Sequence, residues 1–488
     1  MYRPTPGISA MSIYVPRFRV PLEAWCKWTG NNWDKIGATV GNSFRMRGPH
    51  ENVYTMAANA VLRLILANDV DPGQVGFLGL GTESSTDNSA GAIIVRGMVD
   101  RGLEQLGLPR LSRQLEVPEF KHACLGGIYG LKGALRYVSH DGAGKLAIVV
   151  SADTAEYERG STGEPTQGAG AVAMLVEQTP KLLELDLLHA GSASDYRILD
   201  FRKPVARHFM DGYVGRTARF ADFPVFNGRY STHAYLDEIG LAVENMLARL
   251  DMSPDAFYRE VRALFFHRPY HLMPVQAMAM LQIRAIAAGD TDELIGLCAE
   301  AGVLHEDVLR DVASRPDLRE YATADRHTID PLAAASAASQ VLRKRASFQT
   351  LVREKMSLGS GVMKDLGNLY TAALPAWIAA GLEEGVQRGL ALNGAPMAAI
   401  GYGSGDAAEA IPMRVCEGWE HAARRIRVVE SLAQTIDLDE EAYESMHAHG
   451  TAPHFTYAPR GEFAIARVGT DYTSGFQDLG VEYYEYIP

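Results

Sequence analysis

Short apolar segments alternate with helical repeats through the first 180 residues, and this alternation limits the possible folds more than any other feature. Val75–Gly81, Lys145–Asp153 and Gly168–Gln178 are apolar, rich in small or β-branched residues and bounded by glycine or charge, which is typical of buried strands. Between the first two, apolar residues from 128 to 138 recur at spacings of three and four, which predicts one helical face. The pattern predicts an α/β layer structure.

The second part of the chain repeats this order. A strand-like run, a helix and a strand–glycine turn–strand unit follow one another: Val261–Phe266, Gly367–Gly385 and Met397–Val415. We therefore predict two similar α/β halves, residues 1–180 and 181–488, packed against each other. Residues 282–352 have helical spacing and mixed charges, so we interpret them as a solvated helical insertion.

Composition excludes several classes of protein. The 488 residues are 47% hydrophobic, with a net charge of −12, which is spread along the chain and disfavours a nucleic-acid or anionic-membrane surface. The four cysteines form no CxxC pair and no zinc spacing, as expected for free thiols in a reducing compartment. The N-terminus has no signal pattern and no apolar run reaches ~18 residues. We expect a cytoplasmic protein without a metal.

Cys124 stands where a strand-like approach turns into the glycine-rich predicted helix. Unpaired amides and the helix dipole at such a position favour an anion, so a thiol there should lose its proton more easily. Four glycines between 126 and 133 each cost ~1 kcal/mol in a helix, unless other backbone must approach closely. Taken alone, Cys124 also fits a packed core cysteine.

Other polar residues occupy similar places. Glu83 follows a buried strand, with Asp87 four residues on as a cap or an anchor, and His267 ends the apolar run Val261–Phe266. The His267–His271 pair lacks an acidic third ligand, so it does not predict a metal site.

Further candidate site residues lie at a predicted helix start and in a glycine-rich turn. Asn368 opens a predicted helix, and Gly403 and Ser404 lie in the turn Gly401–Gly405. Each of these residues could merely cap a helix, but together they mark the sheet edge at which α/β proteins bind ligands.

These residues lie in motifs that resemble the 3-hydroxy-3-methylglutaryl-CoA synthases of the thiolase superfamily. The matching segments follow in family order along most of the chain: GISAMSIYVPRFRV, TMAANA, GTESSTD, HACLGG, EPTQGAGAVAMLV, DFRKP, FHRPY, GNLYTAAL and GYGSG. The resemblance implies a thiolase-like fold, with two α/β halves in a five-layered αβαβα arrangement, and a homodimer.

The resemblance also implies roles. Cys124 would accept an acetyl group from acetyl-CoA, and Glu83 would remove a proton from the acetyl methyl group and later protonate the new alkoxide. His267 and Asn368 would hold a β-ketoacyl thioester, with His267 also assisting proton transfer as a third catalytic residue. The backbone amides of Ser404 and Cys124 would stabilise oxyanions. Such a reaction uses CoA thioesters as substrates and no further cofactor.

Departures from the family pattern concern the substrate. Leu125 and Ile128 stand where the family has tyrosine and threonine, which predicts a more apolar acyl pocket. Two lysines that help to bind CoA in the family are replaced by Leu272 and Gln276. We expect Arg202, Lys203 or Arg268 to supply the positive charge instead.

Three hypotheses follow. The first is an enzyme that forms HMG-CoA or an analogue from acetyl-CoA and acetoacetyl-CoA. The second is a β-branching synthase that acts on acyl carrier proteins in polyketide assembly, or another thiolase-type acyltransferase. The third, a non-enzymatic partner subunit, would predict loss of the Glu, Cys or His residue, and all three are present.

Overall fold

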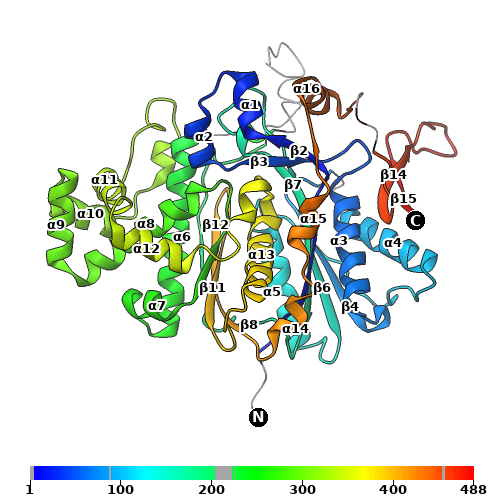
Figure 1. Cartoon of the computed structure of the whole chain (residues 1–488), viewed down its shortest axis with the longest axis horizontal. Helices are drawn as coiled ribbons and strands as arrows, with labels where there is room; N and C mark the ends of the chain where they lie inside the picture. Colours follow the sequence, from blue (N-terminus) through cyan, green and yellow to red (C-terminus); the bar gives the residue numbers. More distant parts are fainter. Residues whose placement is uncertain (1–4, 87–88, 204–222, 226, 453–454, 456) are drawn as a thin grey trace.

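A ten-stranded mixed sheet runs through the whole molecule (Figure 1). The computed structural model describes residues 5–86, 89–203, 223–225, 227–452, 455 and 457–488. The main path has the order β10-β11-β12-β8-β1-β7-β6-β4-β5, and β9 pairs with β12. These strands are β1 (Gly7–Tyr14), β4 (Val75–Gly81), β5 (Glu119–Phe120), β6 (Leu146–Ala155), β7 (Gly168–Glu177), β8 (Leu183–Leu185), β9 (Gly191–Ser194), β10 (Ala263–Phe266), β11 (Pro396–Gly403) and β12 (Ala407–Val415).

The sheet has an N-terminal and a C-terminal part, and β1 joins them by pairing with β8. Gly7 lies opposite Glu184, and Ile8 opposite Leu183. A Cβ atom on Gly7 would come within 1.8 Å of the Leu183 carbonyl oxygen, so only glycine fits this junction. In the N-terminal part, β4 pairs in parallel with β6, and β6 pairs antiparallel with β7. In the C-terminal part, β10 pairs in parallel with β11, and β11 pairs antiparallel with β12.

Helices form three layers around the two parts of the sheet. In Figure 1, α3 (Val53–Ala67) and α4 (Gly91–Gln105) cover the N-terminal part on the right, and α6 (Gly228–Leu250) covers the C-terminal part on the left. Between the two parts lie α5 (Gly126–Ser139) and α13 (Ala373–Gln387). The predicted five-layered αβαβα arrangement is confirmed.

The glycines of α5 allow its first turn to approach the sheet. A Cβ atom on Gly81 would lie 2.3 Å from Gly127 Cα, and one on Gly127 would lie 2.0 Å from Ser151 Oγ. The close approach of backbone predicted from these glycines therefore exists, and it holds the residues before α5 against the ends of β4 and β6.

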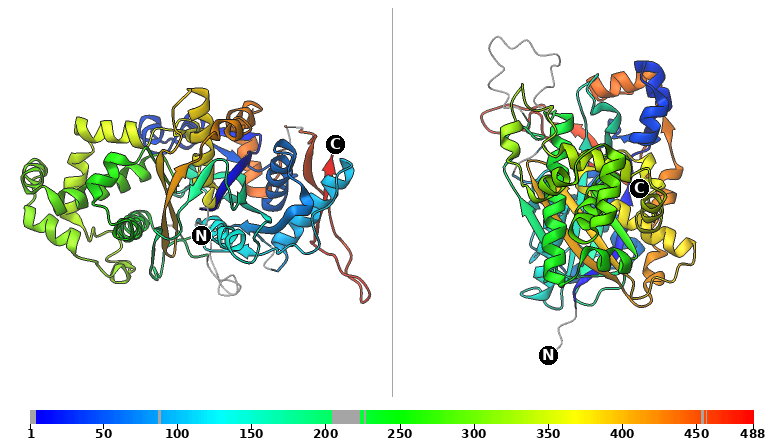
Figure 2. Two further views of the ribbon diagram at one scale, coloured as in Figure 1. Left: turned by 90° about the horizontal axis from the view of Figure 1, so that it is seen from below. Right: turned by 90° about the vertical axis from the view of Figure 1, so that its left-hand side faces the viewer.

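The remaining helices and strands surround this core. Helices α8 (Leu272–Gly289), α9 (Thr291–Ala301), α10 (His305–Ala313), α11 (Ala333–Leu342) and α12 (Ala346–Lys355) form the far end of the molecule beyond α6 (Figure 2). The other elements are β2 (Phe18–Pro21), α1 (Leu22–Thr29), α2 (Trp33–Thr39), β3 (Ser43–Met46), α7 (Pro254–Glu260), α14 (Trp419–Ala423), α15 (Val428–Ala433), β13 (Ile436–Asp437), α16 (Glu440–His449), β14 (Glu462–Val468) and β15 (Glu482–Ile487).

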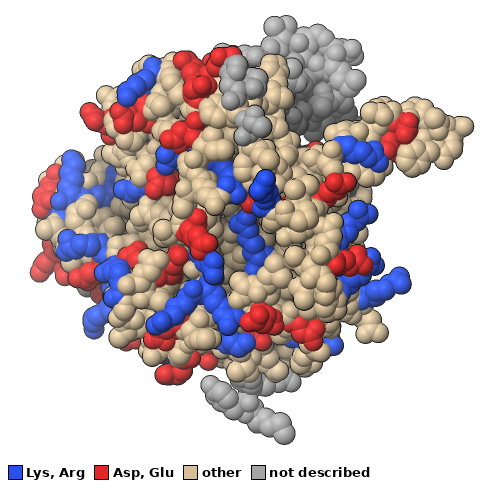
Figure 3. All heavy atoms as spheres, turned by 45° about the vertical axis from the view of Figure 1, so that its right-hand side comes forward, with Lys and Arg blue, Asp and Glu red and all other residues tan. Residues whose placement is uncertain are grey.

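The helix α8 is apolar because it packs inside the protein. By length and composition it could cross a membrane, but 56% of its residues are buried, and it contacts α6, α9, α10, α11 and α12. Acidic and basic side chains are interspersed over the face shown in Figure 3.

Candidate active site

The ends of β10 and β11, the residues before α5 and those before α13 meet around one cavity. Its volume is about 980 Å³, and its wall includes Cys124, His267, Asn368 and Ser404. The four side chains come from segments as far apart in the sequence as 124 and 404, yet they line the same cavity. The structure therefore brings these predicted residues together.

Cys124 and Glu83 form the innermost pair of this site. The thiol donates a hydrogen bond to Glu83 Oε2, with 3.5 Å between sulfur and oxygen. Burial, together with the charge of Asp153, raises the pKa of Glu83 to about 8. Burial and the nearby Glu83 and Asp153 also raise the pKa of the Cys124 thiol well above its ordinary value. The lowered cysteine pKa expected at the start of α5 is therefore wrong, because desolvation and two carboxylates outweigh the helix dipole.

The geometry supplies another route to a thiolate. Glu83 lies in hydrogen-bond contact with the thiol, and a carboxylate whose pKa is near 8 is a far stronger base than an ordinary glutamate. Cys124 therefore keeps its proton in the resting site, and Glu83 can accept that proton when the sulfur attacks.

Asp153, at the end of β6, holds the Glu83 loop in place. Its carboxylate accepts six hydrogen bonds of 2.5 to 3.0 Å from Thr82 Oγ1, Glu83 N, Ser84 N, Ser84 Oγ, Thr371 N and Thr371 Oγ1. These donors belong to the segment after β4 and to the segment before α13. Asp153 is therefore a positioning residue that joins the two sides of the site, and sequence reasoning missed it, although it ends a predicted strand.

His267 follows β10 and faces the cavity with both ring nitrogens free. Neither Nδ1 nor Nε2 has a hydrogen-bond partner among the described residues, whereas the backbone is fixed by His267 N donating to Ile400 O and by Tyr235 Oη donating to His267 O. The ring stacks on that of Tyr402, with 6.3 Å between centroids. Burial lowers the pKa of His267 to about 3, so the imidazole is neutral.

Asn368 lies before α13, which begins at Ala373 and has no side-chain cap, so the predicted helix start at Asn368 is wrong. Its Oδ1 accepts a hydrogen bond from Tyr370 N, and its Nδ2 donates to Tyr157 Oη at 3.3 Å. Tyr157 itself lines the cavity and packs in a small cluster with Cys124 and Tyr370. Tyr157 is thus a residue of the cavity wall that sequence reasoning missed, in addition to the positioning residue Asp153.

Gly403, the last residue of β11, packs against the loop that carries Cys124. A Cβ atom on Gly403 would lie 2.6 Å from His122 O and 2.7 Å from Leu125 Cβ, so glycine lets β11 pack on the cysteine loop. Leu125 and Ile128 are buried in the main core cluster, where they face the glycines of β11, and they are not part of the cavity wall. Their predicted effect on the acyl pocket stays a prediction, and it would have to act through the packing around Cys124.

The three residues expected to supply positive charge for CoA differ in their exposure to solvent. Arg268 is buried, where it donates to Ser360 O and His271 Nδ1 and lies over Trp377. It is therefore not available for a CoA phosphate, and that prediction does not fit the structure. Arg202 and Lys203 are exposed, and Arg202 contacts Tyr196 Oη.

Asp87 lies outside the described residues. Its predicted role as a cap or an anchor for Glu83 stays a prediction.

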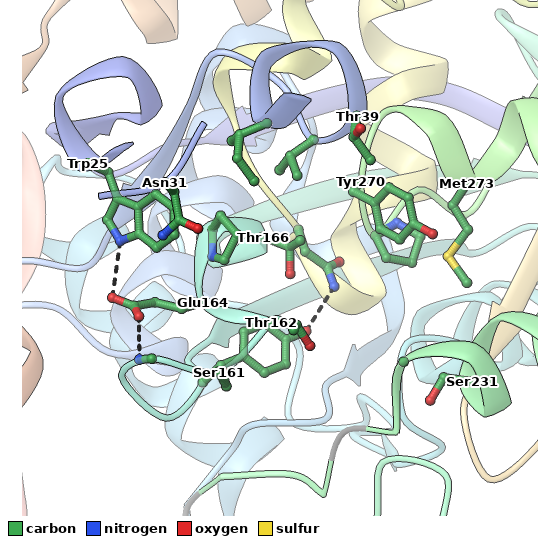
Figure 4. Close-up of a pocket in the computed structure, with 18 of the residues that line it drawn as sticks. Trp25, Asn31, Thr39, Ser161, Thr162, Glu164, Thr166, Ser231, Tyr270 and Met273 are labelled. Atoms are coloured by element: carbon green, nitrogen blue, oxygen red, sulfur yellow. Dashed lines mark hydrogen bonds between the residues drawn. The ribbon is translucent and has the colours of Figure 1, made fainter. Parts of the chain in front are cut away.

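The other end of the cavity is built around Glu164 of the EPTQGAGAVAMLV motif. Glu164 accepts hydrogen bonds from Trp25 Nε1, Tyr443 Oη and Gly160 N. Figure 4 shows Trp25 and Glu164 on one side of the cavity, with Tyr270 and Met273 on the other. Through these hydrogen bonds, Glu164 connects α1 and α16 to the cavity wall.

Comparison with known proteins gives one consistent answer. The family model "Hydroxymethylglutaryl-coenzyme A synthase N terminal" matches residues 3–181. The hydroxymethylglutaryl-CoA synthase of Haloferax volcanii is 27% identical over 90% of this chain and 91% of its own, and synthase A of Dictyostelium discoideum is 25% identical over 98% and 90%.

Solved structures show the same similarity. MvaS in complex with 3-hydroxy-3-methylglutaryl coenzyme A has a TM-score of 0.75 and 25% identity, with 100% of each chain covered. The curacin pathway HMG synthase, at 19% identity and TM-score 0.70 over 99% of this chain and 100% of its own, shares the fold.

The layered fold, with a cysteine directly before its central helix, is thiolase-like, as in the synthase structure that it matches over its full length. In sequence, the chain is similar to the hydroxymethylglutaryl-CoA synthases over most of its length, and residues 3–181 match the model of their N-terminal part.

Proposed function

We propose that the enzyme condenses acetyl-CoA with acetoacetyl-CoA, or a closely related β-ketoacyl thioester, and releases HMG-CoA or its analogue. The observation that carries this proposal is the contact of Cys124 with Glu83, 3.5 Å apart, in a site whose cavity also holds His267 and Asn368. A plain ketoacyl synthase III has cysteine, histidine and asparagine but no glutamate at this place. A carboxylate beside the thiol supplies a base that can remove a proton from the acetyl methyl group.

The first step transfers the acetyl group. The Cys124 proton passes to Glu83 while the sulfur attacks the thioester carbonyl carbon, so a new carbon–sulfur bond forms. The bond to the CoA sulfur then breaks, and the departing thiolate takes the proton. The site ends this step with an acetylated Cys124 and a free Glu83 carboxylate.

The second step joins the two acyl units. Glu83 removes a proton from the acetyl methyl group, and the resulting carbanion attacks the ketone carbon of the second thioester. The ketone oxygen becomes an alkoxide, which takes the proton back from Glu83. Water then hydrolyses the Cys124 thioester, which releases a carboxylic acid and restores the thiol.

Neutral residues hold the second substrate. His267 is uncharged at neutral pH, because burial lowers its pKa to about 3, and its free ring nitrogens can donate to or accept from a thioester or ketone oxygen. Asn368 Nδ2 points to the same part of the cavity as Tyr157. Backbone amides of Cys124 and Ser404 are our candidates for the oxyanion donors.

Mass spectrometry after incubation with acetyl-CoA tests the first step. The wild type should gain one acetyl group on Cys124, and Cys124→Ala should gain none. Cys416→Ala removes another free, half-buried cysteine and should be acetylated like the wild type. Absence of acetylation from acetyl-CoA and from an acetylated carrier protein would overturn the proposal.

Addition of acetoacetyl-CoA tests the second step. Glu83→Ala lacks the group that accepts the thiol proton, so it should still be acetylated, but more slowly, and it should release no condensed product. Normal condensation by this variant would show that Glu83 is not the base. Product formed only from acetoacetyl carrier protein would assign the enzyme to β-branching instead. Homodimerisation and cytoplasmic location stay predictions from the resemblance and the cysteine content.

A further inference from the structure

A second cavity adjoins that of Cys124 and is built partly by the helices of residues 282–352. Its volume is about 390 Å³ and it lies between α6, α8 and α11. Arg229 and Thr232, both on α6, line this cavity and the larger one. We refer to it as the α11 pocket.

Tyr270 stands at the boundary between the two cavities. It lines the Cys124 cavity, on the side opposite Trp25 in Figure 4, and its hydroxyl donates to Gln276 Oε1 at 3.4 Å. Gln276 and Met280, farther along α8, line the α11 pocket. A ligand with its reacting end at Cys124 could thus pass Tyr270 and place its other end in the α11 pocket.

Charge in the α11 pocket is not balanced. Its lining carries two guanidinium groups, Arg229 and Arg343, against one carboxylate, Asp330. That carboxylate lies 3.6 Å from His233 Nε2, and burial lowers the pKa of His233, so the imidazole adds no positive charge at neutral pH. The pocket therefore has a positive excess within a chain whose net charge is −12.

Arg343 is the most unusual of these groups. Its Nε is buried without a hydrogen-bond partner among the described residues, and burial lowers the pKa of this guanidinium. Desolvating a cation without an anion is unfavourable. The arrangement is explained if an anionic ligand completes the site.

The rest of the lining suits a nucleotide. Hydroxyl and amide groups of Thr232, Ser336, Ser339 and Gln340 accompany the aliphatic surfaces of Leu236 and Met280. Arginine binds phosphate through paired, directional N–H donors, while aliphatic side chains can cover a base.

The opposite end of the Cys124 cavity does not have this excess. Its lining there contains Lys35 and Arg159 but also Glu440 and Glu444, and Arg159 is already paired with Glu164 and Glu444. Positive and negative side chains therefore cancel at that end.

We propose that the α11 pocket binds the phosphate-bearing nucleotide end of coenzyme A, with Arg343 and Arg229 pairing with its phosphates. This inference rests on the proposed use of CoA thioesters. It makes the helices of residues 282–352 part of the substrate site, with the pantetheine arm running past Tyr270 toward Cys124.

Kinetics with two acetyl donors test the proposal. Acetyl-CoA carries the phosphates and the nucleotide, whereas S-acetylpantetheine has the same arm without them. In Arg343→Ala, the ratio of the KM for acetyl-CoA to the KM for S-acetylpantetheine should rise about tenfold or more, as expected for a lost charge-assisted hydrogen bond. Arg343→Lys should recover part of this ratio, and Arg343→Ala with Arg229→Ala should raise it further.

Arg353→Ala is the matched control, because Arg353 is an exposed arginine of α12 that contacts Thr350 Oγ1 outside the α11 pocket. It should leave the ratio unchanged. An unchanged ratio in Arg343→Ala would overturn the proposal, as would a defect confined to transfer from an acetylated carrier protein.

Calorimetric titration with free CoA separates this proposal from the proposed function. CoA should bind the wild type more tightly than Arg343→Ala even if no acetylation of Cys124 occurs, since binding does not depend on turnover. Equal affinity of the two correctly folded proteins would overturn the α11 pocket assignment, whereas loss of acetylation with unequal affinity would overturn only the assigned reaction.

Discussion

The two sides of the catalytic cavity are stabilised in different ways. On the Glu83 and Cys124 side, the buried Asp153 carboxylate accepts six hydrogen bonds from two chain segments. On the other side, His267 is placed by its backbone and by stacking on Tyr402, and no described residue hydrogen-bonds to either ring nitrogen. The difference fits the proposed roles, in which Glu83 as a base needs fixed geometry and His267 needs polar atoms that remain available for substrate.

Asp153→Ala should produce the largest effect, because it removes the carboxylate that holds the Glu83 and Cys124 side of the cavity in place. Buried donors left without an acceptor cost about 1–3 kcal/mol each, so we expect the free energy of unfolding to fall by at least about 3 kcal/mol and condensation to be lost. Urea denaturation and product assays measure the two effects. Asp153→Asn retains one acceptor oxygen, so its free energy of unfolding should lie between those of Asp153→Ala and the wild type. If Asp153→Ala were as stable as the wild type, Asp153 would not hold its side of the cavity together.

His267→Ala should affect chemistry more than stability. Condensation should fall about 100-fold or more, while acetylation of Cys124 continues, since the ring makes no hydrogen bond that holds the fold. The same two assays apply, and the loss of stability should be smaller than in Asp153→Ala. If His267→Ala lost more stability than Asp153→Ala, the His267 side of the cavity would contribute at least as much to folding as the Asp153 side.

The pH dependence should report Glu83. Its pKa in the folded protein is about 8, raised from 4.5 by burial first, so the folded state holds a proton that the unfolded state has lost between these values. The stability contributed by Glu83 is therefore complete below pH 4.5 and disappears as the pH rises to about 8.

Glu83→Gln removes this titration. Relative to the wild type, we expect the variant to gain more than about 1 kcal/mol of unfolding free energy between pH 5 and pH 8. Wild-type condensation should rise with pH toward 8 as the carboxylate forms. Parallel stability curves for the two proteins would show that the pKa of Glu83 is not raised.

Ile128→Val should give the smallest effect. Ile128 packs in the core near β11 rather than in the cavity wall, so the change should cost about 0.5–1.5 kcal/mol of stability and leave the preference among acyl-CoA donors unchanged. Competition between acetyl-CoA and propionyl-CoA measures that preference, and a shift would place Ile128 in the acyl site after all.

Much of the site could be predicted because each polar residue lies at the end of an apolar strand or near the start of a helix. That local pattern marks Glu83, Cys124, His267 and Asn368 as candidates, and the family resemblance supplies their expected roles. Asp153 has the same pattern, at the end of Lys145–Asp153, but nothing in the sequence shows that its six donors come partly from a segment more than 200 residues away.

The alternation of strands and helices, the glycines at close contacts and the residues able to perform chemistry can be read from the sequence, because they depend on local spacing and residue type. The packing of distant segments buries Arg268, turns Leu125 toward β11, raises the Cys124 pKa and places Arg343 of the insertion beside the active-site cavity. Burial, side-chain direction and local charge depend on which distant segments pack together, and local sequence patterns carry no information about that packing.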